Sequence, residues 1–122
     1  MITVVVPRED WVSFFNSFSR QHEGWLVTLE ALDYETGALV EARDMTLEGV
    51  AAELNGDDRI EIMIGEKAEK HVTHSIARPV QVRLEETDQG AHYALDIESE
   101  TGSRTLLILR SGVLPETVDA VT

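Results

Sequence analysis

Two different hydrophobic patterns open the chain. Residues 2–6 form a run rich in β-branched side chains, which favour the extended backbone of a strand, and Pro7 ends the run. The next apolar residues recur at spacings of three and four, which places them along one face of a helix. They are Trp11, Phe14, Phe15 and Phe18. The pattern predicts one amphipathic helix that packs through this aromatic face and stops before Gly24.

After Gly24 the period of the pattern changes to two residues, which is typical of strands with one buried face. The alternating segments are residues 25–34, 38–43, 59–64, 72–76, 80–84 and 93–97, and turns that contain glycine separate several of them. In one of these segments Ile60, Ile62 and Ile64 are predicted to face the core. Residues 106–109 are apolar without interruption, which predicts a strand that is covered on both faces.

Residues 45–54 fit two interpretations. Some of their apolar residues match one face of a helix, and an overlapping set matches alternate positions of a strand. The helical set is Leu47, Val50, Ala51 and Leu54, and the strand set is Val50, Ala52 and Leu54. We choose the strand, because Asn55-Gly56 follows directly and favours a tight hairpin turn into the next alternating segment.

Together these elements predict an α+β fold. About eight short strands in hairpin order would form a curled antiparallel β-meander, with the N-terminal amphipathic helix packed on it. Because exposed strand edges favour aggregation, we expect the sheet to curl into a small, partly closed barrel. The alternative is an open, strongly bent sheet with the helix on its concave side. The 122 residues fit one α+β domain at residues 1–112 and a weakly periodic C-terminal tail at 113–122.

The charge balance restricts the partners. The chain has 10 basic and 23 acidic residues, a net charge of −13, and its only lysines are Lys67 and Lys70. A surface of this sign repels phosphate backbones and anionic lipid headgroups, so we expect no nucleic-acid and no membrane partner. The sequence shows neither a secretory signal nor an apolar run of the roughly twenty residues that a membrane span needs, which favours a cytoplasmic protein.

The sequence also lacks the residues and motifs of several chemistries. It has no cysteine, which excludes disulfides, thiolate metal ligands and cysteine nucleophiles. It has no glycine-rich phosphate loop, no serine nucleophile elbow and no zinc-binding helix motif. The segment Asn55-Gly56-Asp57-Asp58 lacks the ligand spacing of a calcium loop, and we interpret it as a turn. We therefore expect neither a cofactor nor a metal.

The end of the predicted helix carries the first candidate site. Arg20, His22 and Glu23 lie close together just before Trp25. A guanidinium, an imidazole and a carboxylate in one place can clamp a small anion or orient a water molecule. The alternative is that Arg20 and His22 only match the negative end of the helix dipole.

His74 is the second candidate. Its alternation with Val72 and Ile76 predicts that its ring faces the core, where a neutral imidazole needs a hydrogen-bond partner. A structural histidine fits this pattern, and so does a general base or ligand at the mouth of a barrel. His71 lies three residues away and would point to the opposite face of the strand, which argues against a metal ion shared by the two.

One hypothesis combines the two candidates. The two imidazoles and a carboxylate would converge at one end of the sheet and form a polar binding pocket. Its members would be Arg20, His22, Glu23, Trp25 and His74.

Five short segments resemble a family of small uncharacterised bacterial proteins, the DUF5335-like domains of unknown function. The segments are Pro-Arg-Glu-Asp-Trp at 7–11, Phe-Ser-Arg-Gln-His-Glu-Gly-Trp at 18–25, Glu-Ala-Arg-Asp at 41–44, Leu-Glu-Gly-Val at 47–50 and His-Val-Thr-His-Ser-Ile at 71–76. The similarity extends to Arg110, and one departure is Thr46, which stands where a proline is expected. The resemblance implies a self-contained domain and assigns no activity and no catalytic residue.

Three classes of function remain open. The most favoured is a small, non-enzymatic cytoplasmic module for binding or interaction, which forms a homo-oligomer through an exposed strand edge. The first alternative is a small hydrolase or isomerase that uses His22, His74 and Glu23. The second is a metal-binding protein that uses histidine ligands. The first class is favoured because catalytic domains of this size usually carry a recognisable nucleophile or ligand motif.

Overall fold

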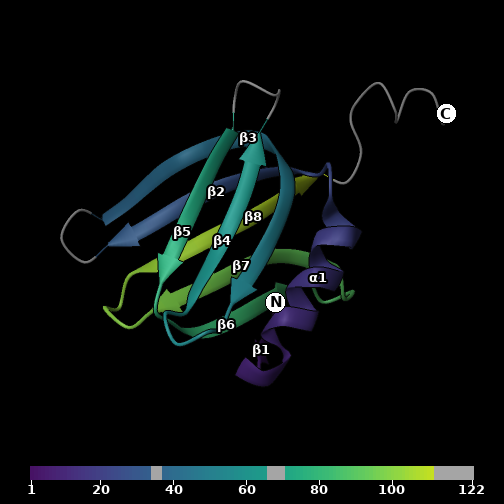
Figure 1. Ribbon diagram of the computed structural model, residues 1–122. Helices are drawn as coiled ribbons and strands as arrows, with labels where there is room; N and C mark the ends of the chain where they lie inside the picture. Colours follow the sequence, from purple (N-terminus) through teal and green to yellow (C-terminus); the bar gives the residue numbers. More distant parts are fainter. Residues whose placement is uncertain (34–36, 66–70, 112–122) are drawn as a thin grey trace, which may run out of the picture.

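The computed structural model describes residues 1–33, 37–65 and 71–111, and one antiparallel sheet dominates it (Figure 1). The described residues form eight strands, a short 3-10 helix and one α-helix. The strands are β1 (Ile2–Val6), β2 (Leu26–Asp33), β3 (Gly37–Glu53), β4 (Arg59–Gly65), β5 (His71–Ala77), β6 (Pro79–Glu86), β7 (His92–Ser99) and β8 (Arg104–Ser111). The helices are η1 (Arg8–Asp10) and α1 (Trp11–His22). The fold is thus mostly sheet with one short helix, which corrects the predicted α+β class. The predicted tail at 113–122 lies outside the described residues.

The order of the strands differs from a simple meander. It is β1-β6-β7-β8-β2-β3-β4-β5, and all neighbours are antiparallel. Two meanders, β2 to β5 and β6 to β8, are therefore joined side by side where β2 pairs with β8. The predicted single meander is wrong on this point, because pairing between distant segments leaves no mark in the local pattern of either segment.

The long strand β3 bends the sheet. Its first part, from Gly37 to Thr46, pairs with β2, and its second part, from Thr46 to Glu53, pairs with β4. Between them Asp44 has a positive φ of 52°, and the register with β2 shifts there. Such a bulge bends and twists a strand. Residues 45–53 are strand, as predicted, but they continue the strand at 38–43 instead of forming a separate one.

A single-residue corner leads from β5 to β6. Arg78 has a positive φ of 49°; its N–H donates to Asp58 O (2.9 Å), and its carbonyl accepts from the N–H of Glu100 (2.9 Å). The corner therefore ties together the turns that follow β3 and β7. Beyond it, the described residues place β5 beside β4 alone and β1 beside β6 alone. The sheet is not closed, which corrects the predicted barrel and leaves the open, strongly bent sheet that was the alternative.

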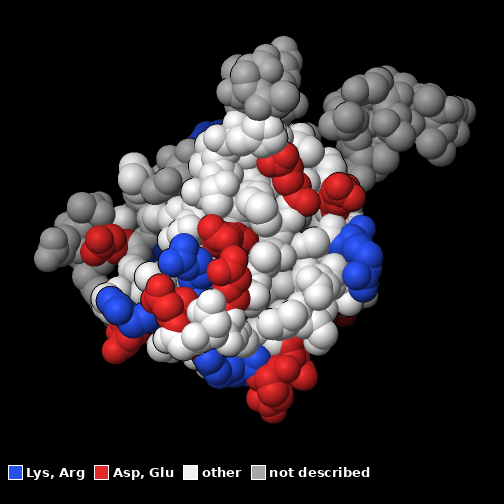
Figure 2. Space-filling view, viewed as in Figure 1, with Lys and Arg blue, Asp and Glu red and all other residues white. Residues whose placement is uncertain are grey.

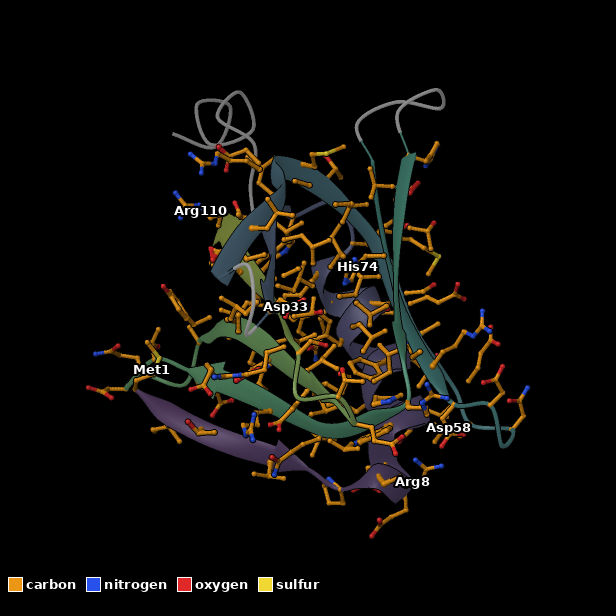
Figure 3. All side chains as sticks on the ribbon, turned by 90° about the vertical axis from the view of Figure 1, so that its left-hand side faces the viewer. Met1, Arg8, Asp33, Asp58, His74 and Arg110 are labelled. Atoms are coloured by element: carbon orange, nitrogen blue, oxygen red, sulfur yellow. The ribbon has the colours of Figure 1, made fainter. Side chains whose placement is uncertain are left out.

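Helix α1 lies inside the bend of the sheet (Figure 3). Its buried face consists of Trp11, Phe15, Phe18 and His22. The helix start is fixed to the end of β1, because the indole N–H of Trp11 donates to Val6 O (2.9 Å). Its aromatic side chains join one core with the inward residues of the sheet, where Ile60, Ile62 and Ile64 are fully buried as predicted.

Two predicted faces are wrong. In the apolar run at residues 106–109 of β8, Leu107 and Leu109 are buried, while Leu106 and Ile108 are half-buried, so this run is not covered on both sides. In β6 the alternation at residues 80–84 predicts that Val80 faces the core together with Val82 and Leu84, but Val80 is 54% exposed. The register with β7 shifts between Pro79 and Gln81, which turns Val80 to the outside.

On the face seen in Figure 2, the charged side chains are spread out and do not gather in one acidic stripe. Figure 2 shows aspartate and glutamate side chains in several separate groups, with arginine side chains between them and uncharged surface around them. The 12-residue α1 is the one α-helix of the described residues, and no helix among those residues is long and apolar enough to cross a membrane.

Candidate functional site

The predicted residues at the end of α1 form two groups. Arg20 and Glu23 are exposed, and the guanidinium of Arg20 lies 3.5 Å from Ser17 Oγ. His22 is 3% exposed, and its ring meets the ring of Trp25 edge-on, with 4.5 Å between the centroids. The structure therefore brings His22 and Trp25 together and leaves the two charged neighbours in solvent.

His22 bonds to a second histidine that the sequence pattern did not single out. Its Nδ1–H donates to Phe18 O (2.8 Å), because a carbonyl oxygen can only accept. Its Nε2 is then an acceptor, and it receives a hydrogen bond from Nδ1–H of His92 on β7 (3.2 Å). On the outer side, Nε2 of His92 lies 3.7 Å from the carboxylate of Glu86. A chain of polar groups thus connects the buried end of α1 with the surface at the β6–β7 hairpin.

Burial determines the charge state of His22. Desolvation lowers the pKa of His22, its bond to Phe18 O opposes that effect, and the neighbouring His92 lowers the pKa further. The ring is therefore held in its neutral form, in which one nitrogen donates and the other accepts. Protonation of His22 would set a second N–H against the N–H of His92.

Acidification is expected to destabilise the protein through His22. The pKa of His22 in the folded state lies below the unfolded value of about 6.5, so the unfolded state takes up the proton first as the pH falls. The free energy of unfolding is therefore unaffected by His22 above pH about 6.5, and it decreases as the pH drops from there toward the folded-state pKa. The loss is at most about 1.4 kcal/mol per pH unit for one proton. Urea unfolding between pH about 7 and 5 measures it.

Two variants make the pH experiment specific to His22. His22→Asn keeps a donor toward Phe18 O but cannot titrate, and we expect a flatter pH dependence. His71→Asn is the control, because His71 is exposed and contacts only the exposed Glu48 among its described partners. Equal slopes in all three proteins would contradict the assignment to His22.

His74 belongs to a different part of the molecule. Its Nε2 lies 3.2 Å from Oγ1 of Thr105, which reaches it from β8 across the inside of the bend. Both residues line a cavity of about 310 Å³ to which the last three residues of β2 also contribute. Trp25, by contrast, directly precedes the first residue of this eight-residue strand, roughly 25 Å long at 3.3 Å per residue. The structure therefore does not bring the five predicted residues together in one pocket.

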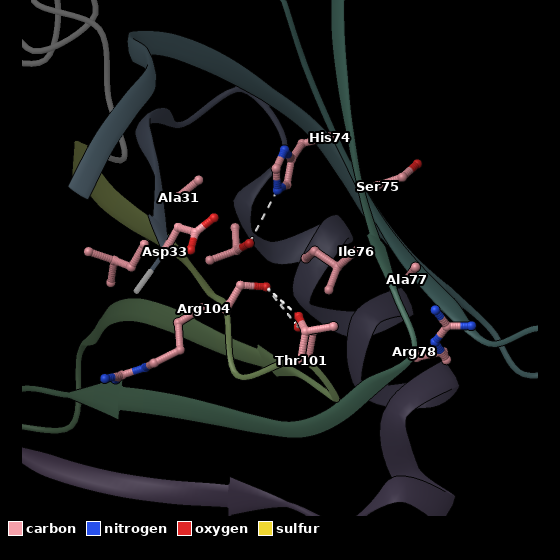
Figure 4. Close-up of a pocket in the computed structure, with 13 residues that line it drawn as sticks. Ala31, Asp33, His74, Ser75, Ile76, Ala77, Arg78, Thr101 and Arg104 are labelled. Carbon is pink, nitrogen blue, oxygen red and sulfur yellow. Dashed lines mark hydrogen bonds between the residues drawn. The ribbon is translucent and has the colours of Figure 1, made fainter. Parts of the chain in front are cut away.

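Hydroxyl groups dominate one wall of this cavity (Figure 4). Ser99, Thr101 and Ser103, from the β7–β8 turn, bond to one another at 2.9, 2.8 and 3.3 Å. With Thr105 they occupy every second position of the sequence from 99 to 105. This alternation was the available signal for the wall, but no candidate site was predicted there.

A buried ion-pair network lies behind the same turn. Asp96 on β7 is 2% exposed, and its carboxylate accepts hydrogen bonds from the guanidinium groups of Arg104 and Arg83. Arg83 also donates to Glu98 (2.9 Å). The hydrogen bond to Asp96 raises the pKa of Arg104. This network links β6, β7 and β8, and it pairs the guanidinium of Arg104 with Asp96.

The edge strand β1 is a second candidate site of a different kind. It pairs only with β6 among the described strands, and it carries no charged side chain. Three of its apolar residues are largely exposed: Ile2 at 47%, Val4 at 40% and Val5 at 53%. Natural edge strands are usually protected by charges, prolines or bulges, and β1 has none of these within its length.

The histidine-based metal site finds no geometric support in the described part of the chain. No group of three or more histidine, aspartate or glutamate side chains among those residues could hold a metal ion.

A further cavity of about 330 Å³ lies among Thr28, Glu30, Arg43, Asp44, Ile108 and Arg110, where Arg110 pairs with Asp44 at 3.7 Å. It contains no histidine.

Comparison with known proteins gives a family and a relative. Residues 2–117 match the model of DUF5335, which is described as a family of unknown function. The chain is 30% identical over 117 residues to an uncharacterized protein of Aquifex aeolicus (strain VF5), which covers 95% of this chain and 100% of the relative. No solved structure matches the chain.

Proposed function

Since the chain belongs to DUF5335, a family of unknown function, we propose from its structure that it is a non-enzymatic interaction module that self-associates through β1. The observation that carries this proposal is that β1 has an edge with no strand partner among the described residues, together with the exposure of Ile2, Val4 and Val5. An exposed edge strand is a template onto which another strand can add, through main-chain hydrogen bonds and alternate side chains.

The two edges of the sheet differ in character, which supports β1 as the interface. On β5 the outward residues His71, Thr73 and Ser75 are exposed and polar. On β1 the exposed residues are mostly valine and isoleucine, the side chains with the highest strand propensity. The apolar edge gains from desolvation when a partner strand covers it, whereas the polar edge does not.

A second copy of the chain is the partner that fits this edge. Two molecules with a charge of −13 repel each other over most of their surfaces, but Ile2–Val6 contributes no charge to that repulsion. A two-fold axis through Val4 would pair two antiparallel β1 strands, with Thr3 opposite Val5 of the other copy. Every pair in this arrangement is uncharged, as an isologous interface in an acidic protein requires.

Val5→Glu is the variant that tests self-association. Val5 is 53% exposed and lies opposite Arg83 of β6, so a glutamate there remains in solvent beside a guanidinium of its own molecule. Between molecules it adds negative charge to the proposed interface. We expect the wild type to sediment at twice the 13.6 kDa of one chain and Val5→Glu to sediment as a monomer. Val12→Glu is the matched control, because Val12 is 46% exposed on α1, and it should stay dimeric.

Two outcomes would contradict the proposal. One is a wild type that keeps the mass of a single chain at every concentration, which would leave β1 for a different partner. The other is a dimer that Val5→Glu and Val12→Glu affect equally, which would place the interface elsewhere.

A further inference from the structure

We propose that the cavity between β5 and the β7–β8 turn binds the ammonium group of a small organic amine. The site is separate from the β1 edge and does not depend on self-association. Its walls are the end of β2, the part of β5 from His74 to Ala77, and the hydroxyl-bearing turn. At about 310 Å³ the cavity is at the small end of the range for ligand sites, roughly 300–1,000 Å³.

The number of hydroxyl protons determines whether the hydroxyl wall can donate or accept hydrogen bonds. Ser99, Thr101 and Ser103 each have one hydroxyl proton, and the three mutual contacts consume all three protons when each group donates to the next. Each oxygen then keeps a lone pair and has no proton left for a ligand. Ser99, the innermost of the three, is 6% exposed, so the fold holds its hydroxyl in place. These three hydroxyl groups therefore accept hydrogen bonds from a ligand and do not donate them.

The opposite side of the cavity carries a carboxylate beside an imidazole. Figure 4 shows the carboxylate of Asp33 and the ring of His74 pointing toward each other from β2 and β5. The positive groups at the rim are directed elsewhere: the guanidinium of Arg104 bonds to Asp96, and that of Arg78 lies 3.4 Å from Glu100. Acceptors and a carboxylate thus face the space, while the two guanidinium groups do not.

An ammonium group matches this arrangement better than other polar groups. It has three donors, no acceptor and a positive charge. An alcohol brings a single donor and no charge, and a carboxylate brings acceptors and a charge that Asp33 and the net charge of −13 both repel. The apolar part of the amine would lie against Ala31, Leu32 and Ile76, which also line the cavity.

NMR titration with three probes of equal size tests the proposal. The probes are propylammonium chloride, propanol and sodium propionate, added to the full chain at constant ionic strength. We expect propylammonium to shift the amide signals of Ser99–Thr105 and His74–Ala77 with saturation in the millimolar range, as befits so small a ligand. Propanol and propionate should produce no saturable shift there. Saturable binding of either at these positions, or no response to propylammonium, would overturn the proposal.

Two substitutions and one control locate the binding. Ser103→Ala breaks the hydroxyl ring, and Asp33→Asn removes the carboxylate; each should weaken propylammonium binding about tenfold, as expected for the loss of a hydrogen bond to a charged group. Ser13→Ala makes the same chemical change as Ser103→Ala on the exposed face of α1 and should leave affinity unchanged. Equal affinity in all four proteins would contradict the assigned site. If Ser103→Ala does not fold, Asp33→Asn and the wild-type titration decide.

Discussion

Phe15→Ala is expected to lower the free energy of unfolding by about 3 to 5 kcal/mol. Phe15 is fully buried on the face of α1 that lies inside the bend of the sheet, and it is part of the single hydrophobic core. Its removal leaves a cavity between helix and sheet that neither can close without moving. A domain of ordinary stability, about 5 to 15 kcal/mol, would lose a large share of it. Urea unfolding measures the loss as a lower midpoint at an unchanged slope.

Val12→Ala is the control for this prediction. Val12 is on the same helix but 46% exposed, and we expect a change within about 0.5 kcal/mol. A small effect at Phe15, similar to that at Val12, would mean that α1 does not fill the bend of the sheet.

The second large effect is expected at Ser19 of α1, whose hydroxyl bonds to the backbone of β3 where β2 no longer pairs with that strand. Beyond Thr46, β3 has no pairing with β2, because Leu26 is the first residue of β2. Ser19 Oγ donates to Val50 O (3.0 Å) and accepts from the N–H of Val50 (2.8 Å), so one hydroxyl satisfies both groups. Ser19→Ala leaves both without this partner in a half-buried place, and we expect a loss of about 2 kcal/mol in urea unfolding.

Ser17→Ala separates the contribution of this contact from that of helix propensity. Ser17 is exposed two residues earlier, and alanine favours a helix in both positions. We expect Ser17→Ala to be neutral or slightly stabilising. A Ser19→Ala protein as stable as Ser17→Ala would show that the bonds to Val50 contribute nothing.

Local patterns predicted the elements of this fold well. The 3.6-residue period at Trp11–Phe18 and the alternation at Ile60, Ile62 and Ile64 both report burial on one face, and the structure has both. The strand at residues 45–53 also followed from its turn signal. These features depend only on neighbours in sequence, which is why the pattern contains them.

Features set by distant contacts could not be predicted. Nothing near residue 92 indicates that its imidazole meets His22, which is 70 positions away. Likewise the pairings of β2 with β8 and of β1 with β6 join segments that lie far apart in the sequence. The positive φ values at Asp44 and Arg78 mark the two bends, but neither residue is glycine, so the sequence carried no turn signal there.

The candidate site shows the same division. The inward position of His74 followed from alternation, and the sequence placed His22 close to Trp25, but the burial of the His22 ring was not predicted. The partners of both histidines come from strands late in the sequence, at His92 and Thr105, and so their separate surroundings became visible only in the folded chain.

Concentration-dependent hydrogen exchange tests the central claim, self-association through β1, most directly. At dilution the outward amides of Ile2–Val6 have no strand partner among the described residues, and they should exchange quickly. We predict that their protection rises as the protein concentration increases, while that of the other edge, His71–Ala77, does not change. Protection of β1 that is independent of concentration, or a rise confined to β5, would contradict the account.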